Sequence, residues 1–326
     1  MVRARIVGTG SYAPERVVTN REIELMVETT DEWIRTRTGI SERRVTTGEN
    51  PSEMAAKAAR AALRSAALAP RDIDLVVVGT VTPEMTFPST ACFVQSQLHI
   101  RSGVPVFDVS AACSGFIYAL DAADKYIRSG ACTNALVIGV DAFSRIVDWK
   151  DRSTCILFGD GAGAVALTAH RGRRGILSSR IHSDGRRWEM LYARGPAAAS
   201  PFERGERGQD PGPLKMQGNE TFKIAIKTMR AVCGELLEET GLAMSDVSLV
   251  IPHQANIRII KALSEKLRLA EDRVYSNIER YGNTSAGSIP LALDEAVRDG
   301  RIKDGDIVLF VAFGGGLTWG ATAVRW

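Results

Sequence analysis

The chain contains an internal repeat, in which residues 63–79 match residues 237–253. The segments LRSAALAPRDIDLVVVG and LEETGLAMSDVSLVIPH share leucine, alanine, aspartate and valine residues at a constant spacing. Farther along, both halves contain a strand-like segment, a turn of small residues and a helix-like segment that includes Ala-Leu-Asp. Hydrophobic periodicity alone produces some chance matches, but two similar α/β halves are the simplest interpretation. We expect an N-terminal half over residues 1–170 and a C-terminal half over residues 171–326.

Strand-like and helix-like segments alternate along the chain, which predicts a layered α/β architecture with buried strands. The hydrophobic fraction of 45% over 326 residues is enough for one large domain or two ordinary ones. A helix is expected after Asn50, because Pro51 suits the first helical position and Glu53 the third. The clearest strand-like segments of the N-terminal half are 75–80, 104–110, 135–141 and 163–168.

Charge and composition exclude several classes of protein. The 41 basic and 38 acidic residues give a net charge of +3, which is too close to balance for nucleic-acid binding by bulk charge. No apolar segment approaches the roughly 20 residues that span a bilayer, and the N-terminal MVRARIVGTG lacks a signal-peptide core, so no membrane partner is expected. Five scattered cysteines without a CxxC pair argue against disulfides and a zinc site, and they predict a reducing, cytoplasmic location.

Three polar residues from distant segments are expected to share one cleft. Cys113 separates a strand-like from a helix-like segment, His253 ends the segment LVIPH, and Asn283 occupies the turn that matches the Cys113 turn in the repeat. Ligand sites of open α/β sheets gather beyond the carboxyl ends of strands. A cysteine at a helix N-terminus is expected to have a lowered pKa, as a thioester-forming nucleophile requires. Each residue alone has an ordinary structural interpretation, but the trio at strand ends favours catalysis.

Glycine-rich segments have competing interpretations. Residues 159–165 and 313–320 mark either close backbone approach or packing turns, and the second segment could present an N–H to an oxyanion. Residues 7–13 fit a dinucleotide-binding fingerprint, but the next helix is expected only at the Thr19 capping box, which makes that interpretation weak. Residues 194–213 are rich in glycine, proline and charge, and we interpret them as a surface loop or flap.

One helix-like segment, NETFKIAIKTMRAV, carries a basic stripe. Lys223, Lys227 and Arg230 fall on one face of this helix, and a later helix adds Arg258 and Lys261. Such a stripe is usually a solvated face. It would also suit an acidic protein partner.

Several motifs together resemble the β-ketoacyl-[acyl-carrier-protein] synthase III family of the thiolase-like superfamily. The resemblance covers essentially the whole chain and rests on TTDEWIRTRTGISERR, DVSAACSGF, IPHQANIRII, RYGNTSAGSIP and FGGGLTWGATAVRW, in this order. It implies a duplicated thiolase-like α/β fold with five layers, αβαβα. The implied activity is a decarboxylative Claisen condensation of a short acyl-CoA, expected to be acetyl-CoA, with malonyl-[acyl-carrier protein]. The 3-ketoacyl product would start fatty-acid synthesis.

The resemblance also implies roles for individual residues. Cys113 would be the nucleophile, His253 and Asn283 would stabilise an enolate, and the amides of Cys113 and Gly315 would form an oxyanion hole. Coenzyme A thioesters are expected as substrates, with no further cofactor and no metal. The remaining implied residues are Trp33, Arg37, Arg152 and Asn219 for coenzyme A, Phe87 for the partner subunit's acyl pocket in a homodimer, and Lys223 and Arg258 for the carrier protein.

Other interpretations remain. Enzymes that prime polyketides or make acyl esters resemble this pattern too, so the product could enter another pathway. A thiolase would have a second cysteine near the C-terminal glycines, where FGGGLTWG has none, and a hydroxymethylglutaryl-type synthase would need an acidic base, for which there is no specific candidate. A carrier-binding scaffold would have lost Cys113 or His253, and both are present. A cysteine hydrolase would leave Trp33 and TRTGI unexplained.

Overall fold

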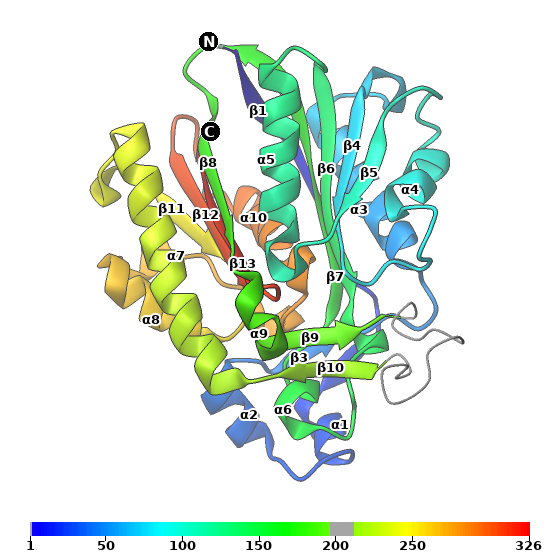
Figure 1. Cartoon of the computed structure of the whole chain (residues 1–326), viewed down its shortest axis with the longest axis vertical. Helices are drawn as coiled ribbons and strands as arrows, with labels where there is room; N and C mark the ends of the chain where they lie inside the picture. Colours follow the sequence, from blue (N-terminus) through cyan, green and yellow to red (C-terminus); the bar gives the residue numbers. More distant parts are fainter. Residues whose placement is uncertain (1, 196–211) are drawn as a thin grey trace.

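Two β-sheets and three layers of helices make up the computed structural model, which describes residues 2–195 and 212–326 (Figure 1). Helices α3 (Pro51–Ala66) and α4 (Thr90–Leu98) cover the outer face of one sheet, and α7 (Gly218–Thr240) and α8 (Ile257–Leu267) cover the outer face of the other. Helices α5 (Gly115–Arg128) and α10 (Ser288–Arg298) lie between the sheets. The order helix, sheet, helix, sheet, helix confirms the predicted αβαβα arrangement.

The first sheet has five strands in the order β1-β7-β6-β4-β5. Strand β4 runs parallel to β5 and β6, whereas β7 runs antiparallel to both β6 and β1. The four predicted strands are therefore confirmed as β4 to β7. The bounds are β1 (Val2–Tyr12), β4 (Leu75–Gly79), β5 (Val106–Val109), β6 (Asn134–Ala142) and β7 (Asp160–Arg171).

The second sheet has four strands in the order β11-β12-β13-β8 and repeats the pairing pattern of the first. Strands β11 and β12 are parallel, like β4 and β6, and β12-β13-β8 are successively antiparallel, like β6-β7-β1. At the position equivalent to β5 in the first sheet, the second sheet has only a single parallel bridge, between Val250 of β11 and Val274. The bounds are β8 (Gly175–Ser183), β11 (Leu249–Pro252), β12 (Ile307–Gly314) and β13 (Thr318–Arg325).

The sequence repeat recurs in local geometry. The short helix η1 (Pro70–Asp72) ends at Asp72, whose carboxylate accepts a hydrogen bond from the Ala69 amide at 2.8 Å. The short helix η6 (Met244–Asp246) ends at Asp246, whose carboxylate accepts from the Ala243 amide at the same distance, 2.8 Å. Both inner helices follow a residue with a left-handed backbone: Ala112 (φ 46°) precedes α5, and Ser285 (φ 49°) precedes α10. Duplication therefore gives each half a tight turn at the start of its inner helix.

Helix α3 packs unusually close to β1. An added Cβ at Gly8 would lie 2.4 Å from the Ala62 carbonyl oxygen, and one at Gly10 would lie 2.3 Å from the Ala62 nitrogen. Gly8 and Gly10 of β1 are therefore required to be glycine because α3 packs directly against them. The first helix begins later, at Asn20, after a capping box of Thr19 and Glu22. The weak dinucleotide-binding interpretation of this segment has no support in the structure, because no helix opens on the glycines.

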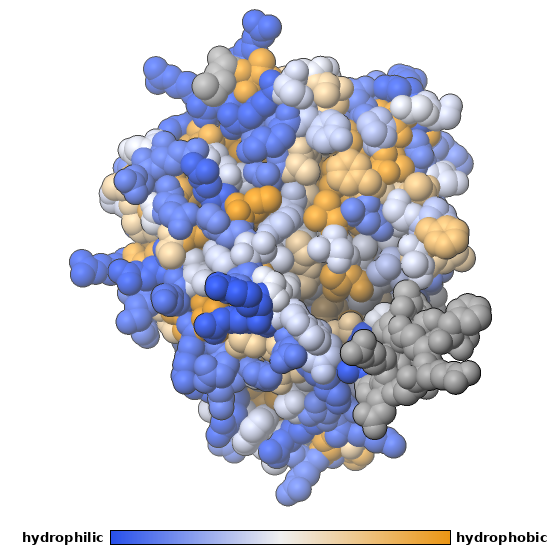
Figure 2. Space-filling model, in the orientation of Figure 1, coloured by the Kyte–Doolittle hydropathy of each residue, from blue (hydrophilic) through white to orange (hydrophobic). Residues whose placement is uncertain are grey.

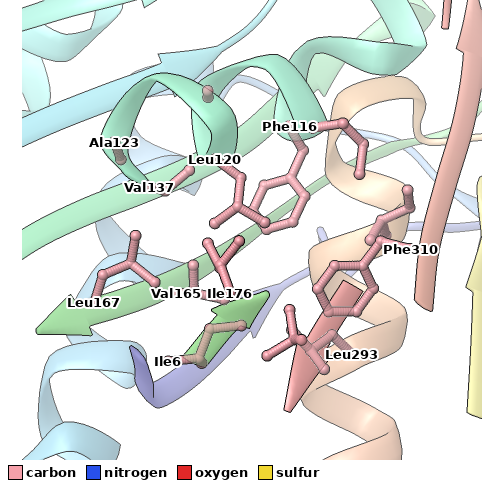
Figure 3. Close-up of a cluster of buried hydrophobic side chains, with 14 of the residues drawn as sticks. Ile6, Phe116, Leu120, Ala123, Val137, Val165, Leu167, Ile176, Leu293 and Phe310 are labelled. Atoms are coloured by element: carbon pink, nitrogen blue, oxygen red, sulfur yellow. The ribbon is translucent and has the colours of Figure 1, made fainter. Parts of the chain in front are cut away.

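The inner layer buries the largest apolar cluster, which joins both sheets through α5 and α10. Figure 3 shows α5 side chains meeting side chains from β6, β7, β12 and α10. Its labelled members include Phe116, Leu120, Val137, Val165, Leu293 and Phe310, all essentially inaccessible to water. This shared core fixes the two inner helices relative to each other, and hence the two turns that precede them.

A smaller subdomain lies at the bottom of Figure 1 and has its own apolar cluster. It contains two two-stranded ribbons and short helices: β2 (Val17–Thr19), β3 (Glu42–Arg44), β9 (Leu191–Arg194), β10 (Gly212–Met216), α1 (Asn20–Glu24), α2 (Asp31–Thr38), α6 (Arg152–Cys155) and α9 (Ile278–Tyr281). The buried guanidinium of Arg43 joins these parts by donating to the Asn20 side chain at 2.9 Å and to the Ile156 carbonyl at 2.8 Å.

The remaining short helices are η2 (Ala112–Ser114), η3 (Phe143–Arg145), η4 (Gly185–Met190), η7 (Glu271–Arg273) and η8 (Ser285–Gly287). In the part of the chain that the structure describes, none of the helices has the length and apolar character needed to cross a bilayer. The predicted loop at 194–213 falls for the most part, over 196–211, outside the described residues.

Candidate active site

A cavity of about 660 Å³ is lined by residues from both halves of the repeat. Cys113, His253, Asn283 and Gly315 all line it. These residues follow β5, β11, α9 and β12, respectively, so the three predicted polar residues and the predicted oxyanion glycine meet in one place.

Cys113 lies in η2, between β5 and α5, and its exposed fraction is 5%. Burial raises the pKa of its thiol to about 12; the hydroxyl of Ser285 lowers the pKa and the carboxylate of Asp141 raises it. The predicted lowering of this pKa is therefore wrong, because removal from water outweighs the favourable position before a helix. The thiol is neutral at pH 7, and its proton must leave as sulfur forms a new bond.

Two backbone amides beside the cysteine can bind an oxygen atom. The β12–β13 hairpin is tied to the cysteine turn, since the Thr318 hydroxyl donates to the Ala111 carbonyl at 2.9 Å. An added Cβ at Gly314 would lie 2.7 Å from the Cys113 nitrogen, so the close contact requires glycine. Within the described residues, neither the Cys113 amide nor the Gly315 amide donates a backbone hydrogen bond. Both N–H groups are available to a ligand oxygen.

His253 directly follows β11 and its imidazole is 4% exposed. Burial lowers the pKa of this imidazole to about 3, so the ring is neutral at physiological pH. Nδ1 lies 2.7 Å from the Ser288 hydroxyl at the start of α10, and the same hydroxyl oxygen accepts from the Gln254 amide at 3.3 Å. When Ser288 donates to Nδ1, the ring hydrogen resides on Nε2, which can then donate to a ligand.

Both backbone polar groups of Asn283 are hydrogen-bonded. Its amide donates to the Leu157 carbonyl at 2.8 Å, and its carbonyl accepts from the Gly159 amide at 3.0 Å. The side-chain Oδ1 accepts from the Ser285 amide at 2.9 Å. This bond fixes the orientation of the carboxamide and leaves Nδ2 as the group that can donate to a ligand.

Three of the four residues predicted to bind coenzyme A line the same cavity. Trp33 and Arg37 come from α2, and Asn219 comes from α7. Arg152 is not among the lining residues, but its guanidinium lies 4.9 Å from the centre of the Trp33 ring, as does that of Arg37. An aromatic ring beside two cations forms a platform that suits a planar base and its phosphates.

Of the residues predicted to dock a carrier protein and to reach a partner subunit, only Arg258 lines the cavity. Arg258 lines the cavity, with its guanidinium 5.7 Å from the centre of the Phe222 ring. Lys223 is exposed on α7 and pairs with Glu220 at 3.0 Å. Phe87 is 83% exposed and does not line the cavity formed by the described residues.

Sequence reasoning missed several residues of the site. Phe143 and Phe158 stack with ring centres 4.7 Å apart and form an apolar wall of the cavity. Ser288 contacts His253, and Asp141 contacts the turn that follows Asn283, each from a distant segment. The serine is part of the GNTSAGS motif, but no spacing in the sequence indicates which histidine nitrogen it meets.

The site combines a thiol, two unpaired backbone amides and two neutral side-chain donors. Such a set suits acyl transfer through a thioester and the stabilisation of an enolate. Among the residues that the structure describes, no cluster of three or more His, Cys, Asp and Glu side chains could hold a metal ion. Together, the duplicated αβαβα fold and this site define a thiolase-like condensing enzyme.

Comparisons with known proteins identify the family of condensing enzymes to which the chain belongs. Residues 107–185 match the family 3-Oxoacyl-[acyl-carrier-protein (ACP)] synthase III, and residues 237–326 match the C-terminal region of the same family. The β-ketoacyl-[acyl-carrier-protein] synthase III of Aquifex aeolicus is 51% identical over 99% of both chains, and that of Thiobacillus denitrificans is 50% identical over 100% of both. The chain belongs to the β-ketoacyl-[acyl-carrier-protein] synthase III family and is an acyltransferase.

Solved structures agree with this assignment. The crystal structure of the Aquifex aeolicus synthase superimposes with a TM-score of 0.92 over 99% of this chain and 100% of that chain. The Thermus thermophilus synthase, 44% identical, gives a TM-score of 0.92 over 99% of both chains. The predicted thiolase-like fold is therefore confirmed over nearly the full length.

Proposed function

We propose that this chain transfers the acyl group of a short acyl-CoA, expected to be acetyl-CoA, to the malonyl unit of malonyl-[acyl-carrier protein]. Carbon dioxide is lost and a 3-ketoacyl-[acyl-carrier protein] is formed, which starts fatty-acid synthesis. The observation that carries this proposal is the convergence of Cys113, His253, Asn283 and Gly315 on one cavity. The names of the relatives, which specify an acyl-carrier protein, support the choice of the second substrate.

In the first step, the sulfur of Cys113 attacks the thioester carbonyl of the acyl-CoA. A new carbon–sulfur bond forms, the bond to coenzyme A breaks, and the proton of the cysteine thiol ends on the departing coenzyme A sulfur. The amides of Cys113 and Gly315 would hold the oxyanion of the tetrahedral intermediate. Covalent capture divides the reaction into two half-reactions, which predicts ping-pong kinetics.

In the second step, malonyl-[acyl-carrier protein] loses carbon dioxide, and the electron pair of the broken carbon–carbon bond forms an enolate. His253 and Asn283 would each donate a hydrogen bond to the enolate oxygen. The carbanion attacks the acyl-cysteine carbonyl, and the cysteine sulfur leaves and regains a proton. Neutral donors suit this step, because the imidazole with a pKa of about 3 carries no extra proton that could quench the carbanion.

Coenzyme A would enter past the Trp33 platform. The indole offers a face for the adenine, while Arg37 and Arg152 supply positive charge for the phosphates. Asn219 lines the cavity from α7 and can hydrogen-bond the amide-rich arm between the nucleotide and the thioester. The acyl-CoA itself is the substrate, and the mechanism uses no additional cofactor and no metal.

The carrier protein would dock beside the cavity on α7 and α8. Lys223 is exposed there, and Arg258 lies between the surface and the cavity lining. Figure 2 shows that hydrophilic side chains dominate this side of the molecule, on the left of the view. Basic side chains at the mouth would steer an acidic carrier protein and orient its arm.

A homodimer would explain an exposed apolar region on the other side of the molecule. Strand β5 is the edge of the five-stranded sheet, and an uncovered sheet edge favours pairing with another chain. Met85 and Phe87 extend from the neighbouring loop with more than half of their surface exposed. Burial of Phe87 in the acyl pocket of the partner subunit would remove this apolar surface from water.

Two further features of the proposal concern organisation and location. The chain would divide into halves at 1–170 and 171–326; the proposed boundary lies at the end of β7 (Asp160–Arg171), just before β8 (Gly175–Ser183), which supports this division. All five cysteines are free thiols, which supports a cytoplasmic location.

The second half-reaction provides the sharpest test of the roles of His253 and Asn283. Release of carbon dioxide from malonyl-[acyl-carrier protein] would be followed in the wild type, His253→Ala and Asn283→Ala, alongside acylation by acyl-CoA. We expect both variants to keep acylation within about threefold and to lose at least roughly tenfold in carbon dioxide release. Equal carbon dioxide release in all three proteins would contradict the proposed enolate site.

A further inference from the structure

The carboxylate of Asp141, near the end of β6, is completely buried behind the cavity. Its Oδ1 accepts hydrogen bonds from the Thr80 hydroxyl at 3.0 Å and the Val81 amide at 2.8 Å. It also accepts from the Thr82 amide at 3.2 Å and the Thr82 hydroxyl at 2.9 Å. One carboxylate oxygen therefore holds three consecutive residues of the loop that follows β4.

The second oxygen of Asp141 holds a different segment. Oδ2 accepts from the Ala286 amide at 3.2 Å, in the turn between Asn283 and α10. The hydroxyl of Ser285 is buried in the same place, and among the described residues it has no hydrogen-bond partner of good geometry. It nevertheless lies where it lowers the pKa of both the Asp141 carboxyl and the Cys113 thiol. Asp141 thus contacts the turn that follows Asn283, and its charge acts on the Cys113 thiol.

We propose that Asp141 is a positioning residue that sets two walls of the active site at once. Through Oδ1 it fixes residues 80–82, of which Val81 lines the cavity. Through Oδ2 it fixes the turn that carries Asn283. The inference rests on the proposed function, in which Asn283 serves the decarboxylation step and the cavity wall receives the acyl-CoA.

A carboxylate suits this position better than a carboxamide. All of the partners given above are N–H or O–H donors, and a carboxylate can accept from them on both oxygens. In an Asp141→Asn variant, one oxygen becomes an NH2 group that must face donors on one of the two sides. The variant can hold the loop at 80–82 or the Asn283 turn, but not both.

Substitutions can test the contacts of Oδ1 separately from the contact of Oδ2. Thr82→Val keeps the shape of the side chain and removes the hydroxyl that donates to Oδ1 and accepts from the Ala142 amide at 2.8 Å. The Ala286 contact of Oδ2 does not involve this hydroxyl. Thr322→Val is a matched control, because Thr322 is also buried and its hydroxyl shares a hydrogen bond with the Ser179 hydroxyl at 2.9 Å, between β13 and β8. The three variants would be compared in acylation by acyl-CoA, in carbon dioxide release, in thermal stability and in amide hydrogen exchange.

We expect Asp141→Asn to slow at least one half-reaction by at least roughly tenfold and to speed hydrogen exchange in residues 80–82 or in residues 283–286, according to the side that its NH2 group faces. Thr82→Val should slow acylation by about fivefold or more and speed exchange in residues 80–82 and at the Ala142 amide, but not in residues 283–286. Carbon dioxide release should stay within about twofold of wild type. Thr322→Val should lower the melting temperature without altering the ratio of the two half-reaction rates.

Two results would overturn the proposal. The first is an Asp141→Asn protein that keeps both half-reactions and both exchange patterns. The second is a uniform loss in which Thr82→Val lowers both rates in proportion to lost stability, as a purely structural substitution would. If Asp141→Asn does not fold, the selective effect of Thr82→Val decides. A wild type without condensing activity would refute the proposed function instead, and hydrogen exchange would still test the anchoring.

Discussion

Acid stability should depend strongly on His253. The folded chain lowers the pKa of this imidazole from 6.5 to about 3 by burial. Above pH 6.5 the ring is neutral in both the folded and the unfolded chain, so it adds no pH dependence. Below that pH the unfolded chain binds a proton that the folded chain excludes, and the free energy of unfolding falls by about 1.4 kcal/mol per pH unit. At about pH 4.5 the loss amounts to about 2.7 kcal/mol, and it levels off near the folded pKa.

The measurement is denaturant unfolding at several pH values from about 7 to about 4.5, for the wild type and for His253→Asn, which cannot titrate there. The stability difference between the two proteins should change by about 2 to 3 kcal/mol over this range, with the wild type losing more as the pH falls. Burial raises the pKa of Asp141 and Asp160, which gives both proteins the opposite slope and cancels in the difference. A difference that stays constant would mean that His253 accepts a proton in the folded chain, and the neutral-donor mechanism would be refuted.

The remaining predictions concern single parts of the site. Asn283→Asp should abolish condensation while acyl-cysteine still accumulates, because the Nδ2 donor is lost; accumulation and turnover measured on one sample would settle this. Trp33→Ala should raise KM for acyl-CoA by about tenfold with kcat within about twofold, and an unchanged KM would contradict the adenine platform. Lys223→Glu combined with Arg258→Glu should raise KM for the malonyl carrier substrate far more than for acyl-CoA, and equal effects on both would remove the docking proposal. Phe87→Asp should shift the protein toward monomer in sedimentation, since it places a charge where an apolar contact is proposed, and an unchanged mass would argue against that interface.

Local sequence signals were sufficient to predict the fold and the meeting of Cys113, His253 and Asn283 in one cavity. The repeat predicted two matching halves, and small residues around Cys113 and Asn283 marked the tight turns that precede α5 and α10. Strand ends placed His253 at the same edge as Cys113. The turns and strands were predictable because turn chemistry and strand periodicity are properties of neighbouring residues.

Contacts between segments that are distant in the chain could not be predicted from the sequence. The pKa of Cys113 depends on burial by the whole fold, which outweighs the local helix position used to predict it. Asp141 and Ala286 are 145 residues apart in the chain, and no periodicity connects them. The partnership of Ser288 with His253 likewise arises only when α10 packs beside β11. Polar residues whose roles come from long-range packing are therefore the part that only the structure supplies.

The central claim is that Cys113 carries the acyl group between the two substrates. The most direct test is the intact mass of the protein after mixing with a panel of acyl-CoAs of different chain length, with Cys113→Ala as the control. The account predicts a mass increase of one acyl group in the wild type, largest for a short chain, and none in the variant. An adduct of equal yield in Cys113→Ala, or wild-type protein that turns over without any acyl adduct, would contradict it.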